Sequence, residues 1–226
     1  MEFLQELLHY LVKDAPIFAA AAWLTIKLTF AALILGVVIG LFFALLKISN
    51  KRILSGIANL YITVIRGTPL IVQIFAIYFG LARIYDFGPF WSPAIALAIH
   101  NGAYIAEIFR GGIQSIDKGQ MEAARSLGMP YSLAMRRIIL PQAFKRVVPP
   151  LGNQFIIGLK DSSLAAFVTA PELFAISMRR AAATLADLEM YAIAGLYYLV
   201  MVIMFSFLVS KLEKKLNVDE ANGGSV

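Results

Sequence analysis

Two long stretches of the sequence contain no Asp, Glu, Lys or Arg, namely residues 28–46 and residues 190–210. A helix needs about 20 apolar residues to cross the hydrocarbon core of a bilayer, and both stretches have that length. Only 15% of the 226 residues are charged, whereas about 25% is usual in a soluble domain. The chain is therefore expected to be an all-α membrane protein, and a soluble globule, a disordered chain and a coiled coil are excluded.

Three further segments bring the expected number of transmembrane helices to five. Residues 53–82 contain a single charge, Arg66, and the Gly and Pro that follow it predict that a short helix ends there and a span begins. Residues 87–106 contain no charge, and residues 147–171 are interrupted only by adjacent Lys and Asp residues. The expected spans are about 16–47, 67–84, 93–112, 147–170 and 190–211.

These helices are expected to form a single transmembrane domain over residues 1–226, because nothing in the sequence marks a second domain. The tail, residues 217–226, is polar and is expected to be disordered. At the other end, apolar residues three or four positions apart predict an amphipathic helix on the outer surface of the membrane. They are Phe3, Leu4, Leu7, Leu8 and Leu11.

The Lys and Arg residues are distributed unevenly between the segments that connect the spans. Fourteen of the twenty lie in residues 47–66, 107–146 and 211–220, and only four lie in the alternate segments. Lys and Arg concentrate in the cytoplasmic loops of membrane proteins. The N-terminus is therefore expected outside and the C-terminus in the cytoplasm, and the net charge of +6 is explained by orientation in the bilayer, with no nucleic acid as a partner.

The longest polar segment, about residues 113–146, contains signals for a helix–turn–helix. The run GQMEAARSL is rich in helix formers, and Gly128 directly after it suits the left-handed position that follows a helix. Pro130 is acceptable in the first turn of a second helix, which Pro141 is expected to end. On composition alone, a solvated basic linker is the alternative.

The same segment carries a specific spacing, E-A-A-x3-G-x9-I-x-L-P, from Glu122 to Pro141. This pattern resembles the EAA loop of the membrane subunits of ATP-binding-cassette (ABC) importers. The resemblance implies that the loop docks a short coupling helix on a partner ATPase. The residues that it assigns to this contact are Glu122, Ala123, Ala124, Arg125, Ser126, Leu127 and Gly128.

Three further segments resemble the permeases of polar amino acids, the histidine/glutamine/arginine/cystine-type (HisM-like) family. They are RGTPLIVQ at residues 66–73, YIAEIFRGGI at 104–113 and KDSSL at 160–164. The resemblance implies a MetI-like, type I importer fold with five transmembrane helices. His100 departs from the family pattern, and the pair at residues 179–180, Arg-Arg, finds no place in it.

The sequence contains no constellation typical of an enzyme or of a metal site. There is no Cys, there are only two His, and no Walker A pattern occurs, so no phosphate-binding loop for ATP is present. No cofactor is expected in this chain. ATP and Mg²⁺ are expected on a separate ATPase subunit, as the family resemblance implies.

Polar or helix-breaking residues inside the spans are candidates for binding a substrate, because such residues are costly in a membrane. A half-helix that begins near Pro69 would direct unpaired backbone amides toward a substrate carboxylate, and Asp161 would meet an α-amino group. The candidate substrate-binding residues are Arg66, Gly67, Thr68, Pro69, Gln73, Asn101, Asp161 and Ser162.

Each of these candidates has a structural alternative. Arg66 can mark the cytoplasmic interface while Gly67 and Pro69 only bend the chain, and Asp161 can pair with its neighbour Lys160 at an interface. Gln73 and Asn101 can bond to neighbouring helices, as polar residues in membranes often do. Glu107 and Arg110 are expected to form an ion pair on the helix surface.

The resemblance as a whole implies a permease subunit of an importer of polar amino acids that works by alternating access. The implied partners are a second permease chain, in a homodimer or a heterodimer, two ABC ATPase subunits and an extracytoplasmic solute-binding protein. The implied location is the prokaryotic plasma (inner) membrane. A passive channel, or an intramembrane enzyme with a loop that binds another partner, is the alternative, and the transported amino acid stays open.

Overall fold

The computed structural model describes residues 2–168 and 170–216, which form helices joined by short connections and contain no strand. The α-helices are α1 (Glu2–Lys13), α2 (Ala15–Lys47), α3 (Arg52–Gly67), α4 (Leu70–Ala82), α5 (Gly88–Gln114), α6 (Lys118–Ser126), α7 (Tyr131–Ala134), α8 (Leu140–Asp161), α9 (Leu173–Thr184) and α10 (Asp187–Lys215). A π-helical turn, η1 (Met135–Ile139), joins α7 to α8, and a 3-10 helix, η2 (Ser162–Val168), follows α8. The tail that the sequence predicts to be disordered, residues 217–226, lies outside the described residues.

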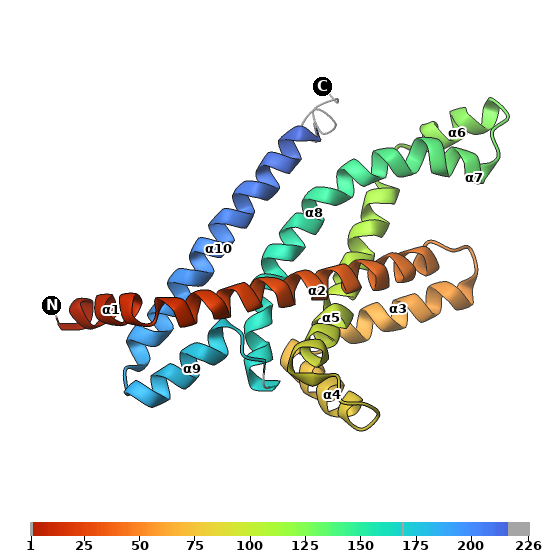
Figure 1. Cartoon of the computed structure of the whole chain (residues 1–226). Coiled ribbons are helices and arrows are strands. Elements are labelled where there is room, and N and C mark those ends of the chain that lie inside the picture. The colour runs from red at the N-terminus through yellow and green to blue at the C-terminus, as the bar shows by residue number, and fades with distance from the viewer. Residues whose placement is uncertain (1, 169, 217–226) are drawn as a thin grey trace.

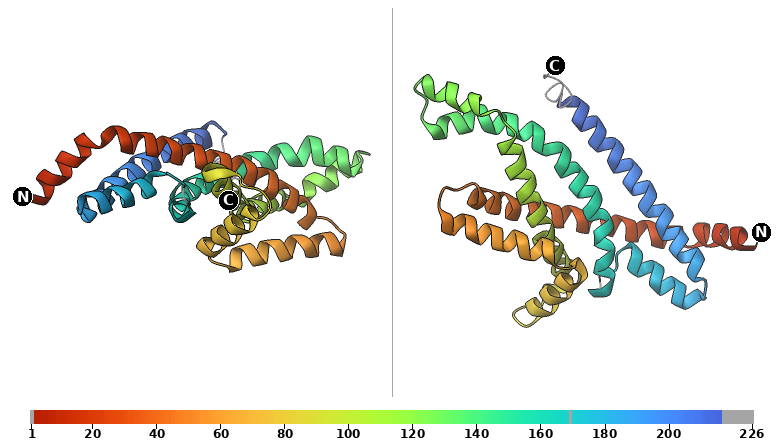
Figure 2. Two further views of the ribbon diagram at one scale, coloured as in Figure 1. Left: turned by 60° about the horizontal axis from the view of Figure 1, so that its bottom comes forward. Right: turned by 180° about the vertical axis from the view of Figure 1, so that it is seen from behind.

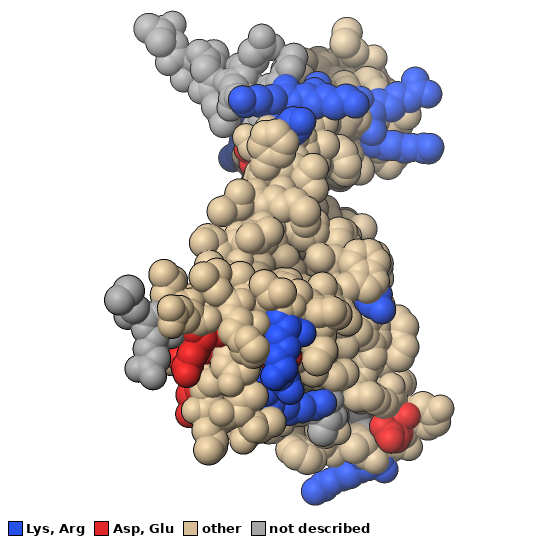
Figure 3. Space-filling model, turned by 60° about the vertical axis from the view of Figure 1, so that its left-hand side comes forward, with Lys and Arg blue, Asp and Glu red and all other residues tan. Residues whose placement is uncertain are grey.

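The molecule is elongated, and different helices form its two ends (Figure 1). The hairpin of α6 and α7 projects at one end, and α9 with the N-terminal helix α1 lies at the other (Figures 1 and 2). Lys and Arg lie at the end that carries α6, α7 and the last turns of α10 and again at the opposite end, and a band of uncharged side chains separates the two groups (Figure 3). This distribution matches the way Lys and Arg flank membrane spans.

Length and composition identify two of the described helices as candidate spans, α2 with 33 residues and α10 with 29. The pair α3 and α4 passes the same test together but is bent by 112° at the break between the two helices. The expected count of five is not confirmed by this measure. In α5 and α8 the apolar residues are diluted by buried polar side chains such as Asn101 and Gln154.

The long helix α2 packs on α5, and glycines allow the two backbones to approach. A Cβ atom built on Gly40 would lie 2.6 Å from Ile105 Cγ2, and one on Gly102 would lie 2.7 Å from Ile39 Cγ2. Close approach through small residues is a common way for helices to associate in membranes. Next to this contact, α3 adds Ile62 to a small cluster with Ala44 and Ala106, so α2, α3 and α5 form one unit.

The largest apolar cluster lies at the end of the molecule that carries α9. Phe18 of α2, Leu173 of α9 and Met190 and Ile193 of α10 are fully buried there. The expected N-terminal helix is observed as α1, and its Leu7 and Leu11 pack against this cluster, whereas Leu4 and Leu8 are exposed. The cluster therefore fixes α1 and α9 on the ends of α2 and α10.

Two helix boundaries differ from the sequence-based expectation, both at prolines. Pro141 does not end a helix, because it lies in the first turn of α8, where its missing N–H leaves no bond unmade. The π-helical turn η1 lies directly before α8, and Gln142 Nε2 donates to the carbonyl of Ile138 at 2.9 Å. Pro93 lies inside α5, which begins at Gly88.

Candidate functional site: a bend, a cavity and a cytoplasmic loop

The bend between α3 and α4 is built by the Gly-Thr-Pro sequence at residues 67–69. Thr68 has an extended backbone (φ −119°, ψ 149°), which is the conformation that a following proline favours. Its hydroxyl donates to the carbonyl of Val64 at 2.8 Å and so satisfies one free carbonyl of the helix end. Gly67 and Pro69 are exposed at the break, as expected for residues that shape a bend.

Gln73 lies beneath this bend and is almost completely buried. Its Nε2 donates to the carbonyls of Ile65 at 2.6 Å and Thr68 at 2.9 Å, and it lies 2.8 Å from Thr68 Oγ1. Its Oε1 lies 2.8 Å from Nδ1 of His100 on α5. Both polar atoms of the Gln73 side chain thus bond to the protein itself, which favours a structural role for this residue.

Arg66 lies at the end of α3, with its guanidinium 5.2 Å from the centre of the Tyr104 ring on α5. As the sequence predicts, a short helix ends beside Arg66, which lies at the break within the bent pair. Arg66 is exposed and, among the described residues, has no ion-pair partner. A cation inside a candidate span without a carboxylate partner is available to meet a ligand or another chain.

Arg66 and Tyr104 open onto a cavity of about 650 Å³ between α3, α5 and α8. Its lining includes two cations, Arg66 and Arg146, one carboxylate, Glu107, and the amide of Gln154. Pro149 and Pro150, inside α8, form another part of the wall. The two guanidinium groups suit the carboxylate of a small ligand, whereas the Glu107 carboxylate is already paired with Lys47 and Arg110.

The other predicted substrate residues do not line this cavity. Asn101 is buried behind it, where its Oδ1 accepts a hydrogen bond from Gln154 Nε2 at 2.9 Å. Asp161 and Ser162 lie at the end of α8, and Ser162 Oγ donates to the carbonyl of Leu159 at 2.8 Å. Their neighbours Lys160 and Ser163 line a separate cavity of about 310 Å³ with Tyr191 and Tyr198.

Of the eight predicted substrate residues, therefore, only Arg66 lines the larger cavity. Sequence reasoning missed Tyr104, Arg146 and Gln154, which come from α5 and α8. The adjacent prolines 149–150 within an apolar segment were a signal for this wall, because prolines inside a helix leave backbone carbonyls without donors.

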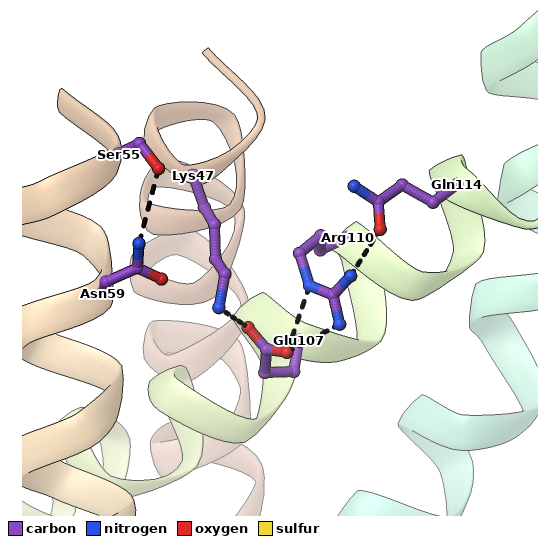
Figure 4. Close-up of polar contacts among 6 residues, drawn as sticks. All are labelled: Lys47, Ser55, Asn59, Glu107, Arg110 and Gln114. Carbon is purple, nitrogen blue, oxygen red and sulfur yellow. Dashed lines mark hydrogen bonds and ion pairs between the residues drawn. The ribbon is translucent and has the colours of Figure 1, made fainter. Parts of the chain in front are cut away.

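A polar cluster connects the ends of α2 and α5 beside this cavity (Figure 4). Glu107 Oε1 lies 2.6 Å from Lys47 Nζ, and its Oε2 lies 2.8 Å from Arg110 Nη2. The expected ion pair of Glu107 and Arg110 is thus confirmed, and Lys47 is a partner that the sequence did not reveal. Arg110 also donates to Gln114, the last residue of α5, so the cluster extends toward the α6 hairpin.

The predicted helix–turn–helix is present. Asp117 caps α6 by accepting a hydrogen bond from the Gly119 backbone N–H at 2.6 Å, and Gly128 follows the helix with φ +82°. The N–H groups of Gly128 and Met129 donate to the carbonyls of Arg125 at 3.0 Å and Ala124 at 3.1 Å. These two bonds form a Schellman motif, in which a left-handed glycine reverses the chain.

The hairpin is anchored on one side and exposed on the other. Buried Ile116, Ile139 and Ala143 form a small apolar cluster beneath it. Ala124 is buried, whereas the other residues predicted to contact an ATPase are exposed, and Leu127 keeps 84% of its accessible surface. A large apolar side chain exposed at the tip of a structured loop favours a contact with a partner protein.

Comparison with known proteins relates most of the chain to transport proteins. Residues 36–218 match the family model described as binding-protein-dependent transport system inner membrane component. The arginine transport system permease protein ArtQ of Bacillus subtilis is 36% identical over 211 residues, which cover 92% of this chain and 96% of that protein.

Two solved structures have the same fold. One, described as an amino acid ABC transporter with histidines, has a TM-score of 0.85 and 44% sequence identity, and the match covers 91% of this chain and 96% of that chain. The other, the MetNI methionine ABC transporter in an inward-facing conformation, has a TM-score of 0.79 at 19% identity, covering 91% and 98%. The fold is therefore the MetI-like, type I importer fold.

Proposed function

Because the chain belongs to the family of binding-protein-dependent transport system inner membrane components, we propose that it is the permease subunit of an ATP-driven importer of polar amino acids. The α6 hairpin carries this proposal, since it presents the EAA residues on a structured and exposed tip. The names of the similar proteins, which refer to arginine and to amino acids, support the substrate class. A passive channel or an intramembrane enzyme has no support in these similarities.

The proposed topology has five spans, formed by α2, by α3 with α4 as one bent span, and by α5, α8 and α10. The chain then forms one transmembrane domain in the plasma (inner) membrane of a prokaryote, with the N-terminus outside. The concentration of Lys and Arg at the end that carries α6 and α7 supports a cytoplasmic position for that end (Figure 3).

The proposed assembly contains a second permease chain, identical or related, and two ABC ATPase subunits that bind ATP and Mg²⁺. An external solute-binding protein delivers the substrate. Residues 122–128, in α6 and the turn that follows it, contact the ATPase. ATP-driven closure of the two ATPases moves the α6 hairpins and turns the dimer from inward-facing to outward-facing. Hydrolysis then resets it. Since α6 follows α5 and the π-helical turn precedes α8, such a movement reaches two of the three helices that line the larger cavity.

The proposed substrate site lies at the larger cavity, where Arg66 has no ion-pair partner among the described residues and Arg146, which also donates to the carbonyl of Ser115, forms part of the lining. Gly67, Thr68 and Pro69 form the bend that carries Arg66, and Gln73 and Asn101 support the bend and the wall from behind. Asp161 and Ser162 lie at another level of α8, beside the smaller cavity. Because neither residue lines the larger cavity, a contact of Asp161 or Ser162 with the substrate is a separate part of the proposal.

The test is reconstitution of the chain in nanodiscs with the ATPase encoded beside it. The ATPase rate is measured with its binding protein loaded with glutamine, glutamate, histidine, arginine or cystine. Stimulation by one loaded amino acid is the expected result. An intact chain that associates with no ATPase, or a rate that no loaded amino acid changes, contradicts the proposal.

A matched pair of variants tests the site. Arg66→Gln removes the cation at the cavity and is expected to lower transport at least tenfold, about the effect of one charged hydrogen bond. Arg83→Gln removes an exposed arginine after α4 that has no ion-pair partner among the described residues, and it is expected to leave transport unchanged. Equal transport by both variants would exclude Arg66 as a substrate contact.

A further inference from the structure

The orientation of the buried Gln73 amide follows from its neighbours. Nε2 faces the carbonyls of Ile65 and Thr68, which only accept hydrogen bonds. It also faces Thr68 Oγ1, whose own proton is directed to the carbonyl of Val64. A nitrogen with two N–H groups fits these acceptors, and an oxygen in its place would face only oxygen atoms. The atom of Gln73 that lies 2.8 Å from His100 is therefore the oxygen.

This orientation determines the hydrogen on His100. Since Gln73 Oε1 can only accept, His100 Nδ1 must carry the hydrogen and donate it. Of the two ring nitrogens, Nε2 makes no hydrogen bond to any described residue. Because no buried side-chain nitrogen or oxygen among the described residues lacks a partner, Nε2 keeps some accessible surface. Nδ1 of His100 is thus bonded to Gln73, whereas Nε2 is not bonded to any described residue.

His100 connects the bend to α5, the helix that carries Tyr104. The His100 and Tyr104 rings are 5.1 Å apart, one helical turn from each other. Tyr104 lies beneath the Arg66 guanidinium, and Arg66 is the residue after Ile65, whose carbonyl Gln73 holds. The contacts of Gln73 with His100 and with Ile65 therefore connect α5, which carries Tyr104, to the end of α3, which carries Arg66.

We propose that His100 and Gln73 are positioning residues for the larger cavity. Their hydrogen bond, with the bonds of Gln73 to Ile65 and Thr68, forms a bend network that fixes the 112° break between α3 and α4 and so holds Arg66 over Tyr104. Gln73 supports recognition of the substrate from behind and does not touch it. The part of this inference that concerns recognition rests on the proposed function, and the part that concerns the bend does not.

Three substitutions of His100 separate its two nitrogens. In His100→Asn, the amide nitrogen is attached to Cγ as Nδ1 is, so the donor to Gln73 is kept and Nε2 is lost. In His100→Gln, the polar group lies further out, near the level of Nε2, and the donor at Nδ1 is lost. His100→Leu removes both. The bend network therefore predicts that His100→Asn keeps the hydrogen bond to Gln73, whereas His100→Leu and His100→Gln lose it.

The first readout is hydrogen–deuterium exchange of residues 66–75 in the permease–ATPase complex in nanodiscs, which does not depend on transport. His100→Leu is expected to increase exchange at the bend about tenfold, the range for one unsatisfied buried acceptor, and His100→Asn to leave it near that of the wild type. An unchanged bend in His100→Leu overturns the proposal. If that variant does not assemble, the Asn and Gln variants give the same comparison.

The second readout is equilibrium binding of radiolabelled L-glutamine, L-arginine and L-histidine to the same complex without binding protein. His100→Leu and Arg66→Gln are each expected to weaken binding about tenfold. The double variant is expected to bind no more weakly than the worse single variant, because both act through Arg66. Additive losses, or rescue by Gln but not by Asn, would make His100 Nε2 the contact and overturn the proposal. If the wild type binds none of the three, the proposed substrate class fails, and hydrogen exchange still decides the bend network.

Discussion

Asp14 and Arg180, 166 positions apart in the chain, form a two-pronged ion pair. Arg180 Nη2 lies 2.7 Å from both carboxylate oxygens of Asp14, and Nε lies 3.0 Å from Oδ2. The Asp14 side chain keeps only 3% of its accessible surface. The pair joins the break between α1 and α2 to α9, and it gives Arg180 the role that the sequence did not reveal.

Removing the arginine of this pair is expected to destabilise the protein. Arg180→Ala leaves a buried carboxylate without a partner, which costs roughly 2–3 kcal/mol after allowance for the partial exposure of Arg180. The measurement is the thermal unfolding midpoint of the purified complex. Arg179→Ala is the matched control, because Arg179 is exposed and forms no ion pair with any residue that the structure describes. Equal midpoints for the two variants would mean that the ion pair contributes nothing to stability.

The contact between α2 and α5 is expected to tolerate no added methyl group at Gly40. The Cβ atom of Gly40→Ala would lie 2.6 Å from Ile105 Cγ2 and 3.0 Å from the backbone nitrogen of Ala106. The backbone nitrogen cannot move away alone, so the helices must separate, at a cost of about 1–3 kcal/mol. The readout is again the unfolding midpoint.

Gly56→Ala on α3 is the control for Gly40→Ala, since a Cβ atom there meets nothing within 4 Å. Alanine is the better helix former by about 1 kcal/mol, so this variant is expected to be neutral or slightly stabilised. A loss of stability in Gly56→Ala equal to that in Gly40→Ala would remove the steric explanation.

The stability of the α9 end is expected to fall as the pH rises from 4.5 through 6. Glu172 caps α9, where its carboxylate accepts hydrogen bonds from the N–H groups of Phe174 and Ala175 and from the hydroxyl of Tyr198. Burial nevertheless raises the pKa of the Glu172 carboxyl from 4.5 to about 6, and these hydrogen bonds only limit the increase.

The direction of this pH dependence follows from the protons that the Glu172 carboxyl binds in the folded and in the unfolded chain. Below pH 4.5 the carboxyl is neutral in both the folded and the unfolded chain, and above pH 6 it is charged in both, so the folded state bears a penalty of about 2 kcal/mol at neutral pH. Unfolding midpoints of the wild type and of Glu172→Gln at pH 4.5 and pH 7 check this. The wild type is expected to lose more stability than the variant between the two values, and parallel pH profiles would contradict the assignment.

The parts of the fold that could be predicted are those that local physics determines. Charge-free runs of about 20 residues predict helices such as α10, and the residues around Gly128 predict the reversal after α6, because only the local chain is involved. The pair of Asp14 and Arg180 could not be predicted, since neither residue has a local signal and the partner is 166 positions away.

The site was less predictable than the fold for the same reason. Arg66 was identified because a charge is rare in an apolar segment, and Gln73 because it is polar. The sequence could not show that Gln73 turns toward the backbone of its own bend and toward His100, since that depends on the angle between α3 and α4. Tyr104 was part of a family-like segment but was not identified as a site residue, because aromatic residues are common in spans.

Gly128 is expected to be required for coupling between the ATPase and transport. Its φ of +82° is strained for a side chain with a branched Cβ, so Gly128→Val is expected to disrupt the Schellman turn, at a cost of roughly 1–2 kcal/mol, and to displace Leu127 at the exposed tip. Gly128→Asn is the matched control, because asparagine tolerates the left-handed conformation. In the reconstituted complex, the Val variant is expected to hydrolyse ATP with little transport per ATP, whereas the Asn variant is expected to stay near the wild type. Normal coupling in Gly128→Val at normal expression would contradict the assignment of this loop to the ATPase contact, since the turn positions every exposed residue of the tip.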